Sequence, residues 1–426
     1  MNQSRRSDHS RRSVLSRRSV LSRRSVLGGA LAAVPVALVA AGPAHADEAT
    51  TPATPIPEVP LASNGRPVVR DIQRQLVARY GARAGFPAVT TDGVWTGDSH
   101  TALIHALQLE MGIDEATANG VMGPLTRTTL QEQATLTVGS ADTTGYLVHL
   151  LQASLVVMST WDGPVDGTFS AEQGVRISQF QRSMALPETG RGDHRTWAAL
   201  LASNGDPTRP GDAADGITVI TAERARTLKD AGCTIVGRYL TDSDRPDALA
   251  KRIVDGELDA IFAGGLKVFP IFQEGGTDTT YFSYDLGVRA AGRADDAARR
   301  LGFLPGTPIY YAVDFDATGD EVETYLEPYF RGIHAELERR GSAYRVGVYG
   351  GRRVCGTLAD AHLTELSFVA DMPTGWGANL GVKIPGNWAF DQILEHTVGT
   401  GDGAIGIDTN VVSGRDVGQS RIEPRG

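Results

Sequence analysis

Residues 307–318 constrain the fold more than any other stretch of this 426-residue sequence. They read TPIYYAVDFDAT, in which Ile309 to Val313 form an almost unbroken apolar and aromatic run. Such a run is typical of a strand that is covered on both faces of a parallel sheet. Asp314 and Asp316 follow it, and side chains two residues apart on an extended chain point to the same side, roughly 6–7 Å apart. The sequence therefore predicts two carboxylates that face one space.

A single Asp after a strand is often only a helix cap or a turn residue. The pair is harder to explain in this way, because removing charge from water costs several kcal/mol unless something uses or compensates it. A helix is predicted to begin near Asp320, so the unit is strand, acidic turn and helix. In a βα barrel, active sites lie at this end of the strands. Both aspartates are therefore candidate catalytic residues.

The segment 216–420 alternates strand-like and helix-like stretches, which predicts an α/β domain with a parallel sheet. Seven or eight strands favour an irregular TIM-type βα barrel over an open sheet. The predicted strands are 217–220, 234–240, 266–272, 308–313, 345–349, 366–370, 387–393 and 405–407, and the predicted helices are 222–231, 248–263, 285–301, 320–340 and 352–361. No G-x-G-x-x-G motif follows an early strand and no metal-binding His or Cys cluster occurs, so we expect neither a cofactor nor a metal.

Polar and aromatic residues gather at the predicted strand ends, which a barrel would bring to one rim. Carboxylates and amides bind hydroxyl groups, aromatic faces stack on pyranose rings, and a carboxylate pair cleaves glycosidic bonds. For each residue alone a packing or capping role is the alternative, so the concentration of these groups carries the prediction. Asp408 joins Asp314 and Asp316 as a candidate catalytic residue, and the candidate binding residues are Arg238, Tyr239, Gln273, Glu274, Tyr349, Asp371, Trp388, Asp391, Gln392 and Asn410.

Residues 1–46 have the three parts of an export signal, which are arginine pairs, an apolar run and small residues before the cleavage site. Arg23-Arg24 precedes the run and points to the twin-arginine route, with cleavage after Ala46. The run spans only about 14–17 residues, so we expect a cleaved leader rather than a membrane anchor. Residues 47–65 are rich in Pro, Thr and Ala and are predicted to be a linker. These features predict secretion to the cell envelope or cell wall.

Two units between residues 66 and 203 repeat one order of motifs. The second unit, 143–203, contains Leu-Gln at 151–152, Asp-Gly-Thr-Phe at 166–169, Phe-Gln at 180–181 and Thr-Trp at 196–197. The first unit, 66–135, lacks the Phe-Gln pair and the closing tryptophan. Short amphipathic helices joined by Asp-Gly turns predict two small all-α modules of three helices each. Residues 204–215 are predicted to be a second linker, because Pro, Gly and Asp are frequent there.

The repeated motif resembles the peptidoglycan-binding module of many wall-lytic proteins, and the second copy fits it better than the first. The resemblance implies modules that dock on the glycan or the stem peptide of the wall. Phe169, Phe180 and Trp197 are also explained as core residues, so individual binding residues cannot be assigned.

The barrel segment resembles the glycoside-hydrolase-like domain of exported actinobacterial proteins, a relative of the family 25 lysozymes. The resemblance implies that Asp314 and Asp316 match the catalytic pair and that Asp408 matches a later aspartate. Asp316 stands where the lysozymes have Glu, and the predicted first strand, 216–219, has no Asp where they carry one. The motifs are GRYLT at 237–241, VFPIFQEGG at 268–276, PIYYAVDFDAT at 308–318, YRVGVYGGRRVC at 344–355, SFVADM at 367–372, NWAFDQI at 387–393 and IDTN at 407–410.

We therefore expect an exported, wall-associated protein whose barrel binds or hydrolyses an envelope glycan, with Asp316 as general acid and Asp314 as stabilising carboxylate. A non-catalytic glycan-binding or scaffolding protein is the alternative. An amidase or peptidase is disfavoured, because the sequence has neither a metal-ligand cluster nor a Gly-x-Ser-x-Gly motif.

Charge and cysteine content limit the partners further. The chain has a net charge of −9, and without residues 1–46 it has 33 basic and 49 acidic residues and a net charge of −16. Such a surface disfavours nucleic acid as a partner, and peptidoglycan or another envelope polysaccharide remains the expected one. Cys233 and Cys355 either form a disulfide, as export would allow, or stay as two buried thiols. Nothing in the sequence indicates an oligomeric state.

Overall fold

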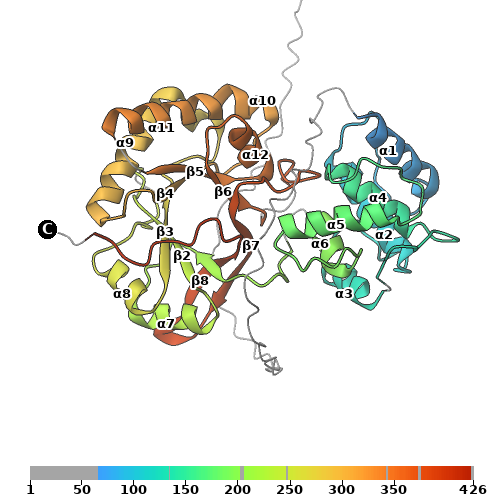
Figure 1. Cartoon of the computed structure of the whole chain (residues 1–426), viewed down its shortest axis with the longest axis horizontal. Coiled ribbons are helices and arrows are strands. Elements are labelled where there is room, and N and C mark those ends of the chain that lie inside the picture. Colours follow the sequence, from blue (N-terminus) through green and yellow to red (C-terminus); the bar gives the residue numbers. More distant parts are fainter. Residues whose placement is uncertain are drawn as a thin grey trace, which may run out of the picture. The chain divides into compact units, whose positions relative to one another are not determined.

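The computed structural model describes residues 66–133, 135–201, 206–245, 248–341, 344–372 and 376–423. The predicted leader and first linker, 1–65, lie outside the described residues. A helical region, 67–201, precedes a β-barrel with surrounding helices (Figure 1). Among the described residues, no helix has both the length and the apolar character that crossing a bilayer requires.

The helical region has one shared core. Its α4 packs against α1 and α2, and α3 packs against α6, so that helices of both repeats are in contact. Buried leucines of both repeats, such as Leu107 and Leu151, belong to one hydrophobic cluster. The predicted division into two modules is therefore not confirmed. The helices are α1 (Pro67–Tyr80), α2 (Gly97–Glu110), α3 (Pro124–Glu132), α4 (Leu147–Val157), α5 (Ala171–Ser183) and α6 (His194–Leu201).

A buried glutamine explains the repeated motif. Gln152 on α4 accepts a hydrogen bond from the backbone N–H of Gly167, and its amide donates to the Asp166 side chain and to the Thr168 carbonyl. Gly167 has a φ of 75°, a conformation that favours glycine. The Gln152 side chain thus holds the turn before α5 from inside the domain.

Three more glutamines do the same for other turns. In the first repeat, Leu107-Gln108 stands in the place of the missing Phe-Gln pair, and the Gln108 side chain accepts from the N–H of Gly120. The polar members of the motif are therefore structural. The remaining pairs are Gln73 with Gly93, and Gln181 with Gly190.

Eight strands close into a barrel in the order β1 to β8. Neighbours from β1 to β7 are parallel, whereas β8 runs antiparallel to both β7 and β1. The strands are β1 (Ala213–Asp215), β2 (Ile235–Tyr239), β3 (Lys267–Phe272), β4 (Pro308–Ala312), β5 (Arg345–Gly350), β6 (Leu366–Ala370), β7 (Trp388–Val398) and β8 (Ile405–Val412).

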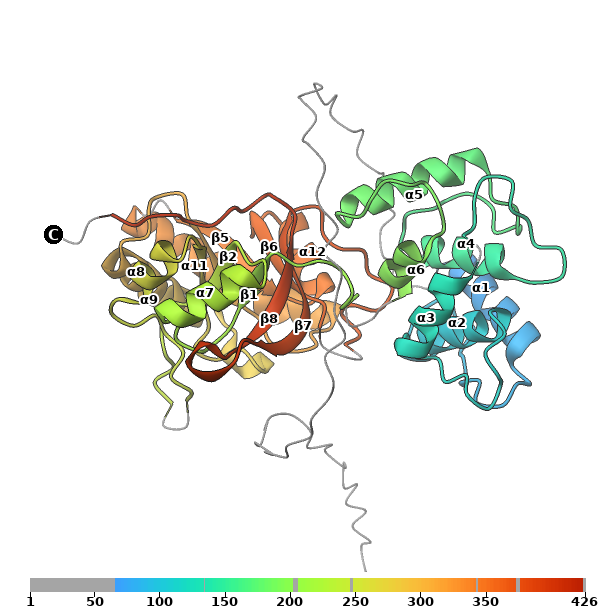
Figure 2. The same cartoon turned by 90° about the horizontal axis from the view of Figure 1, so that it is seen from below.

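Helices pack around the barrel, and the β7–β8 hairpin ends the fold without an intervening α-helix (Figure 2). The longest helices, α9 and α11, pack against each other. The helices are α7 (Ala222–Asp230), α8 (Glu257–Ala263), α9 (Tyr284–Leu301), α10 (Gly319–Glu321), α11 (Glu327–Arg340) and α12 (Arg352–Asp360), with a π-helical segment η2 (Val322–Leu326) and 3₁₀ segments η1 (Thr279–Tyr281) and η3 (Gly401–Gly403).

Aromatic rings fill the inside of the barrel. Phe269 and Phe390 are stacked with ring centroids 4.1 Å apart, and Tyr310 and Phe368 pack on them edge-on. Gly237 makes room for this core, because a Cβ there would lie 2.5 Å from the Phe269 ring. The interior is therefore a packed core, and a ligand site of this barrel has to lie at a rim.

The structure corrects three local predictions. The first strand is Ala213–Asp215 and not 217–220, which lacks strand structure. Of the predicted helix 248–263, only α8 at Glu257–Ala263 forms. The strand predicted at 405–407 extends to Val412 and pairs along most of β7. The two cysteines, Cys233 and Cys355, are both buried and free, which decides between the two alternatives.

Candidate active site

Nine polar or aromatic side chains from seven strands and one connection form a connected group, which we call the rim cluster. Asp215 and Tyr239 are the last residues of β1 and β2, and Gln273 follows β3 directly. Asp408 is paired with Asp215 in the β1–β8 register, so the antiparallel strand brings it to the same level. The rim cluster consists of Asp215, Tyr239, Lys251, Gln273, Asp314, Tyr349, Gln392, Asp408 and Asn410.

Asp215 is the centre of one hydrogen-bond network. Its Oδ2 accepts from the side-chain amides of Gln392 and Asn410, both at 3.0 Å. The Gln392 amide also donates to Asp408 Oδ2 at 3.3 Å, and its Oε1 accepts from the Tyr349 hydroxyl at 2.9 Å. Gln392 therefore connects two carboxylates and a tyrosine.

Asp314 belongs to a second network. Its Oδ2 accepts from the Gln273 amide at 3.2 Å, and Gln273 Oε1 accepts from Lys251 Nζ at 2.7 Å. The Lys251 ammonium also lies over the Tyr239 ring, 4.3 Å from its centroid. Lys251 thus places a positive charge next to Asp314 through one intervening amide.

The two networks act on each other electrostatically. Burial raises the pKa of Tyr239 and of Tyr349, and the charges of Asp215, Asp314 and Asp408 raise both further. Burial lowers the pKa of Lys251 to about 8, although the charge of Asp314 opposes this change. The three carboxylates therefore share one partly desolvated space.

The acids differ in their protonation. Burial raises the pKa of Asp408, and the carboxylates of Asp215, Glu395 and Asp314 raise it further. Burial also raises the pKa of Asp215, but the amides of Asn410 and Gln392 stabilise its charged form. In this pair burial raises both pKa values, and the neighbouring carboxylates make the protonated form more favourable for Asp408 than for Asp215.

Solvent reaches one side of the rim cluster. Asp215, Gln392 and Asn410 are buried, at 4%, 2% and 0% exposure, and form its floor. Asp314 and Asp408 are partly exposed above this floor. A ligand can therefore reach two of the three carboxylates.

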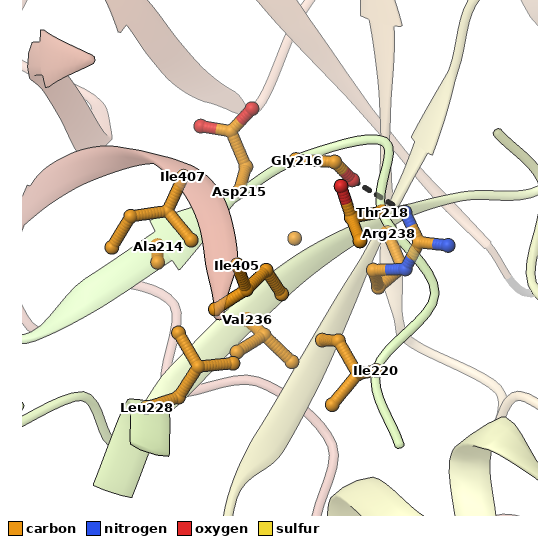
Figure 3. Close-up of a pocket in the computed structure, with 11 residues that line it drawn as sticks. Ala214, Asp215, Gly216, Thr218, Ile220, Leu228, Val236, Arg238, Ile405 and Ile407 are labelled. Carbon is orange, nitrogen blue, oxygen red and sulfur yellow. Dashed lines mark hydrogen bonds between the residues drawn. The ribbon is translucent and has the colours of Figure 1, made fainter. Parts of the chain in front are cut away.

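Asp215 faces the rim and not the outer surface of the sheet. Figure 3 shows a small pocket beside it, lined by apolar side chains such as Ile220, Val236 and Ile407, and the Asp215 carboxylate points away from them. Asp215 borders this pocket together with Ala214, but successive residues of a strand point to opposite faces, and the Asp215 carboxylate points away from it. The pocket belongs to the packing between the barrel and α7 and is not the candidate site.

Asp316 is held elsewhere. Its two carboxylate oxygens accept from the backbone N–H groups of Gly377 and Ala378, both at 2.8 Å. Because β4 ends at Ala312, the two-residue alternation of an extended strand does not continue through Asp314 and Asp316. The two aspartates consequently have different partners, and Asp316 anchors a loop.

Five other predicted residues are engaged in structural contacts. Each is bound to a charged or backbone partner that accounts for its position, and Arg238, Asp371, Trp388 and Asp391 are also buried. These contacts join Arg238 to Glu257 and to the Gly216 carbonyl, Glu274 to Arg293, Asp371 to Arg352, Asp391 to Arg209, and the Trp388 indole N–H to the Ser183 carbonyl.

The sequence analysis missed two members of the rim cluster, Asp215 and Lys251. Asp215 lies in the segment that was read as a linker, although the resemblance called for an aspartate in the first strand. No sequence signal distinguished Lys251, which lies in the connection between β2 and α8. No group of side chains with metal-binding geometry occurs among the described residues.

Comparisons with known proteins agree with this architecture. Residues 226–412 match the family described as Rv2525c-like, glycoside hydrolase-like domain. The C-terminal region is an Rv2525c-like domain. Residues 62–201 match the FadG/YbfG, PGDB-like domain, a peptidoglycan-binding-like domain, as one unit. The predictions of a glycoside-hydrolase-like barrel and of a preceding peptidoglycan-binding-like region are therefore confirmed at this level.

Two relatives match this chain over more than the Rv2525c-like domain, so the similarity includes part of the region before it. The uncharacterized proteins FadG and YbfG of Bacillus subtilis (strain 168) are 41% and 42% identical over 355 and 372 residues. The matches cover 83% and 85% of this chain but only 61% and 50% of the relatives, so the chain spans about half to three-fifths of their length.

Two solved structures are more distant. The Mycobacterium tuberculosis Tat-secreted protein Rv2525c in complex with HEPES is 22% identical, with a TM-score of 0.42, and the match covers 50% of this chain and 99% of that chain. An uncharacterized B. stearothermophilus protein is 19% identical, with a TM-score of 0.35, and the match covers 48% and 96%.

Proposed function

We propose that this protein is exported to the cell wall, binds peptidoglycan through its helical region and hydrolyses a glycosidic bond of an envelope glycan at the rim cluster. The leader-like residues 1–46 and the PGDB-like match support the first two parts. The third part depends on one observation, which is that Asp314 and Asp408 are partly exposed above a buried Asp215.

The roles follow from the surroundings of each carboxyl. Asp408 carries the proton and serves as general acid toward the leaving oxygen. Burial raises the pKa of Asp314, although the Gln273 amide and the Lys251 charge oppose this change, and Asp314 serves as the second carboxylate. Asp215 orients Gln392 and Asn410 and keeps Asp408 protonated. This assignment replaces Asp316 as the acid, because the backbone N–H groups of Gly377 and Ala378 already occupy both oxygens of Asp316 outside the rim cluster.

The test is the release of reducing ends from purified peptidoglycan. Asp408→Asn and Asp314→Asn are expected to lower the rate by about 100-fold or more, since general acid catalysis typically contributes 10²–10⁴-fold. Asp316→Asn should lower it by about tenfold or less, because the Asn oxygen can still accept from the loop. Equal losses in Asp316→Asn and Asp408→Asn would return the acid role to Asp316. Equal release by all variants would reject catalysis at this site.

A non-catalytic glycan-binding protein is the second candidate. It is favoured by the position of Asp316, because the Asp-x-Asp motif does not form the lysozyme-like pair that the resemblance implies. In that case the protein would sediment with insoluble wall while releasing no reducing ends. Asp314→Asn would then weaken binding without any change in the wall polymer.

A further inference from the structure

A second cavity, of about 430 Å³, lies beside α12. It is formed by α12, the segment 381–386 and residues of the connection between β4 and α11, including Gly319. No member of the rim cluster lines it. Its volume is within the range of small-molecule sites, which is about 300–1,000 Å³. We call it the α12 groove.

Arg353 brings a positive charge to the α12 groove, whose lining also includes Glu323, Asp360 and Lys383. Within the described parts of the chain, its guanidinium has neither an ion pair nor a side-chain hydrogen bond, and the side chain is partly buried. The neighbouring Arg352 is different, because both carboxylate oxygens of Asp371 accept from its guanidinium. Asp316, the acid whose charge acts on Arg353, is already bound to the backbone N–H groups of Gly377 and Ala378.

Gly356 lines the groove from α12. It lies in the interior of α12, where glycine costs stability relative to alanine. Packing does not require it, because a Cβ at this position would meet no atom within 4 Å. A side chain at Gly356 would therefore have open space on the face of α12 that lines the groove.

Arg353, Gly356 and Thr357 lie on one face of α12, since residues three and four apart are neighbours on a helix. A guanidinium matches the two oxygens of a carboxylate. The other side of the groove offers apolar contact with Val382 and Pro385. We propose that the α12 groove binds the free carboxylate of a small organic group, with Arg353 as its anchor. This site is separate from the proposed glycosidase site.

Two sources of such a carboxylate fit a wall-associated protein, a peptide C-terminus and an acidic sugar. The full chain would be titrated calorimetrically with N-acetyl-alanyl-alanine and with its C-terminal amide, and separately with N-acetylmuramic acid and N-acetylglucosamine. We expect the charged member of at least one pair to bind about tenfold more tightly than the uncharged member. The pair that shows this difference identifies the source.

Three variants locate the binding. Arg353→Gln should weaken it about tenfold, and Gly356→Met should abolish it by filling the groove. Gly356→Ala should retain the fold with a higher unfolding temperature, which separates groove filling from helix damage. Arg300→Gln removes the same charge from an exposed position and should change nothing. Equal affinity for the charged and uncharged members, or unchanged affinity in both Arg353→Gln and Gly356→Met, would overturn the proposal.

Discussion

The helical region and the barrel rim both contain polar residues in repeated or clustered motifs, but these residues differ in how many hydrogen-bond partners they have. In the helical region, the Gln152 side chain uses both its oxygen and its nitrogen on a neighbouring turn. At the rim, Asp408 has a single amide contact at 3.3 Å and three acids that repel its charge. A polar group with a complete set of partners stabilises the fold, whereas one with too few partners is available for chemistry.

Gln152→Ala gives the largest expected effect on stability and tests the first half of this comparison. The substitution leaves the buried N–H of Gly167 and the turn before α5 without their partners. We expect the free energy of unfolding of the helical region to fall by about 2–4 kcal/mol, measured by urea denaturation. Gln131→Ala, at an exposed position on α3, is the control and should change it by less than about 0.5 kcal/mol. Equal effects of the two substitutions would show that the Gln152 hydrogen bonds do not stabilise the helical region.

Asp408→Asn tests the other half, and its effect should depend on pH. The pKa of Asp408 is raised in the folded state, so its contribution to stability is full below its unfolded pKa of about 3.9 and is lost as pH rises through the folded pKa. An asparagine cannot ionise and avoids this loss. We expect the variant to be more stable than the wild type by about 1–2 kcal/mol at pH 8, and equally stable near pH 4.

Thermal unfolding of the two proteins across this pH range measures the difference. Asp402→Asn removes a carboxylate from the exposed turn η3 and is the control. If the stability difference for Asp408→Asn has the same pH dependence as that for Asp402→Asn, the neighbouring acids do not destabilise the Asp408 carboxylate. The contrast with the helical region would then disappear.

The cysteines give the smallest expected effect. Burial raises the pKa of Cys233 to about 11, and Cys355 is also buried, so both thiols are protonated and behave as small apolar groups. A reducing agent should therefore leave the unfolding temperature unchanged. Alkylation after denaturation without reductant should modify two thiols per chain. A protein that takes up the reagent only after reduction would contain the disulfide that the structure lacks.

Most of the barrel could be predicted from sequence because its strands carry strong local signals. The run Pro308 to Ala312 is buried at every position, and the observed strand differs from the predicted one by a single residue. The first strand escaped prediction because it has only three residues. Its order comes from pairing with β2 and β8, which lie far away along the chain.

The candidate site was predictable in its location and less so in its members. Asp314, Gln273 and Asp408 were found because strand ends meet at one rim. Asp316 has the same residue type as Asp314 and lies two positions later, but the chain has left the strand by then and loop contacts determine where the side chain points. Asp371 is likewise bound to Arg352, and the sequence alone does not show that these two residues are in contact.

The antiparallel course of β8 has a consequence for how the domain folds. Asp215 and Asp408 are separated by most of the domain in sequence, and only the last strand joins the first. A chain that stops before β8 would leave both β1 and β7 with unpaired edges. Because loop closure over such a distance is slow, the acidic pair should be among the last features to assemble, and a partly synthesised domain would lack this pair.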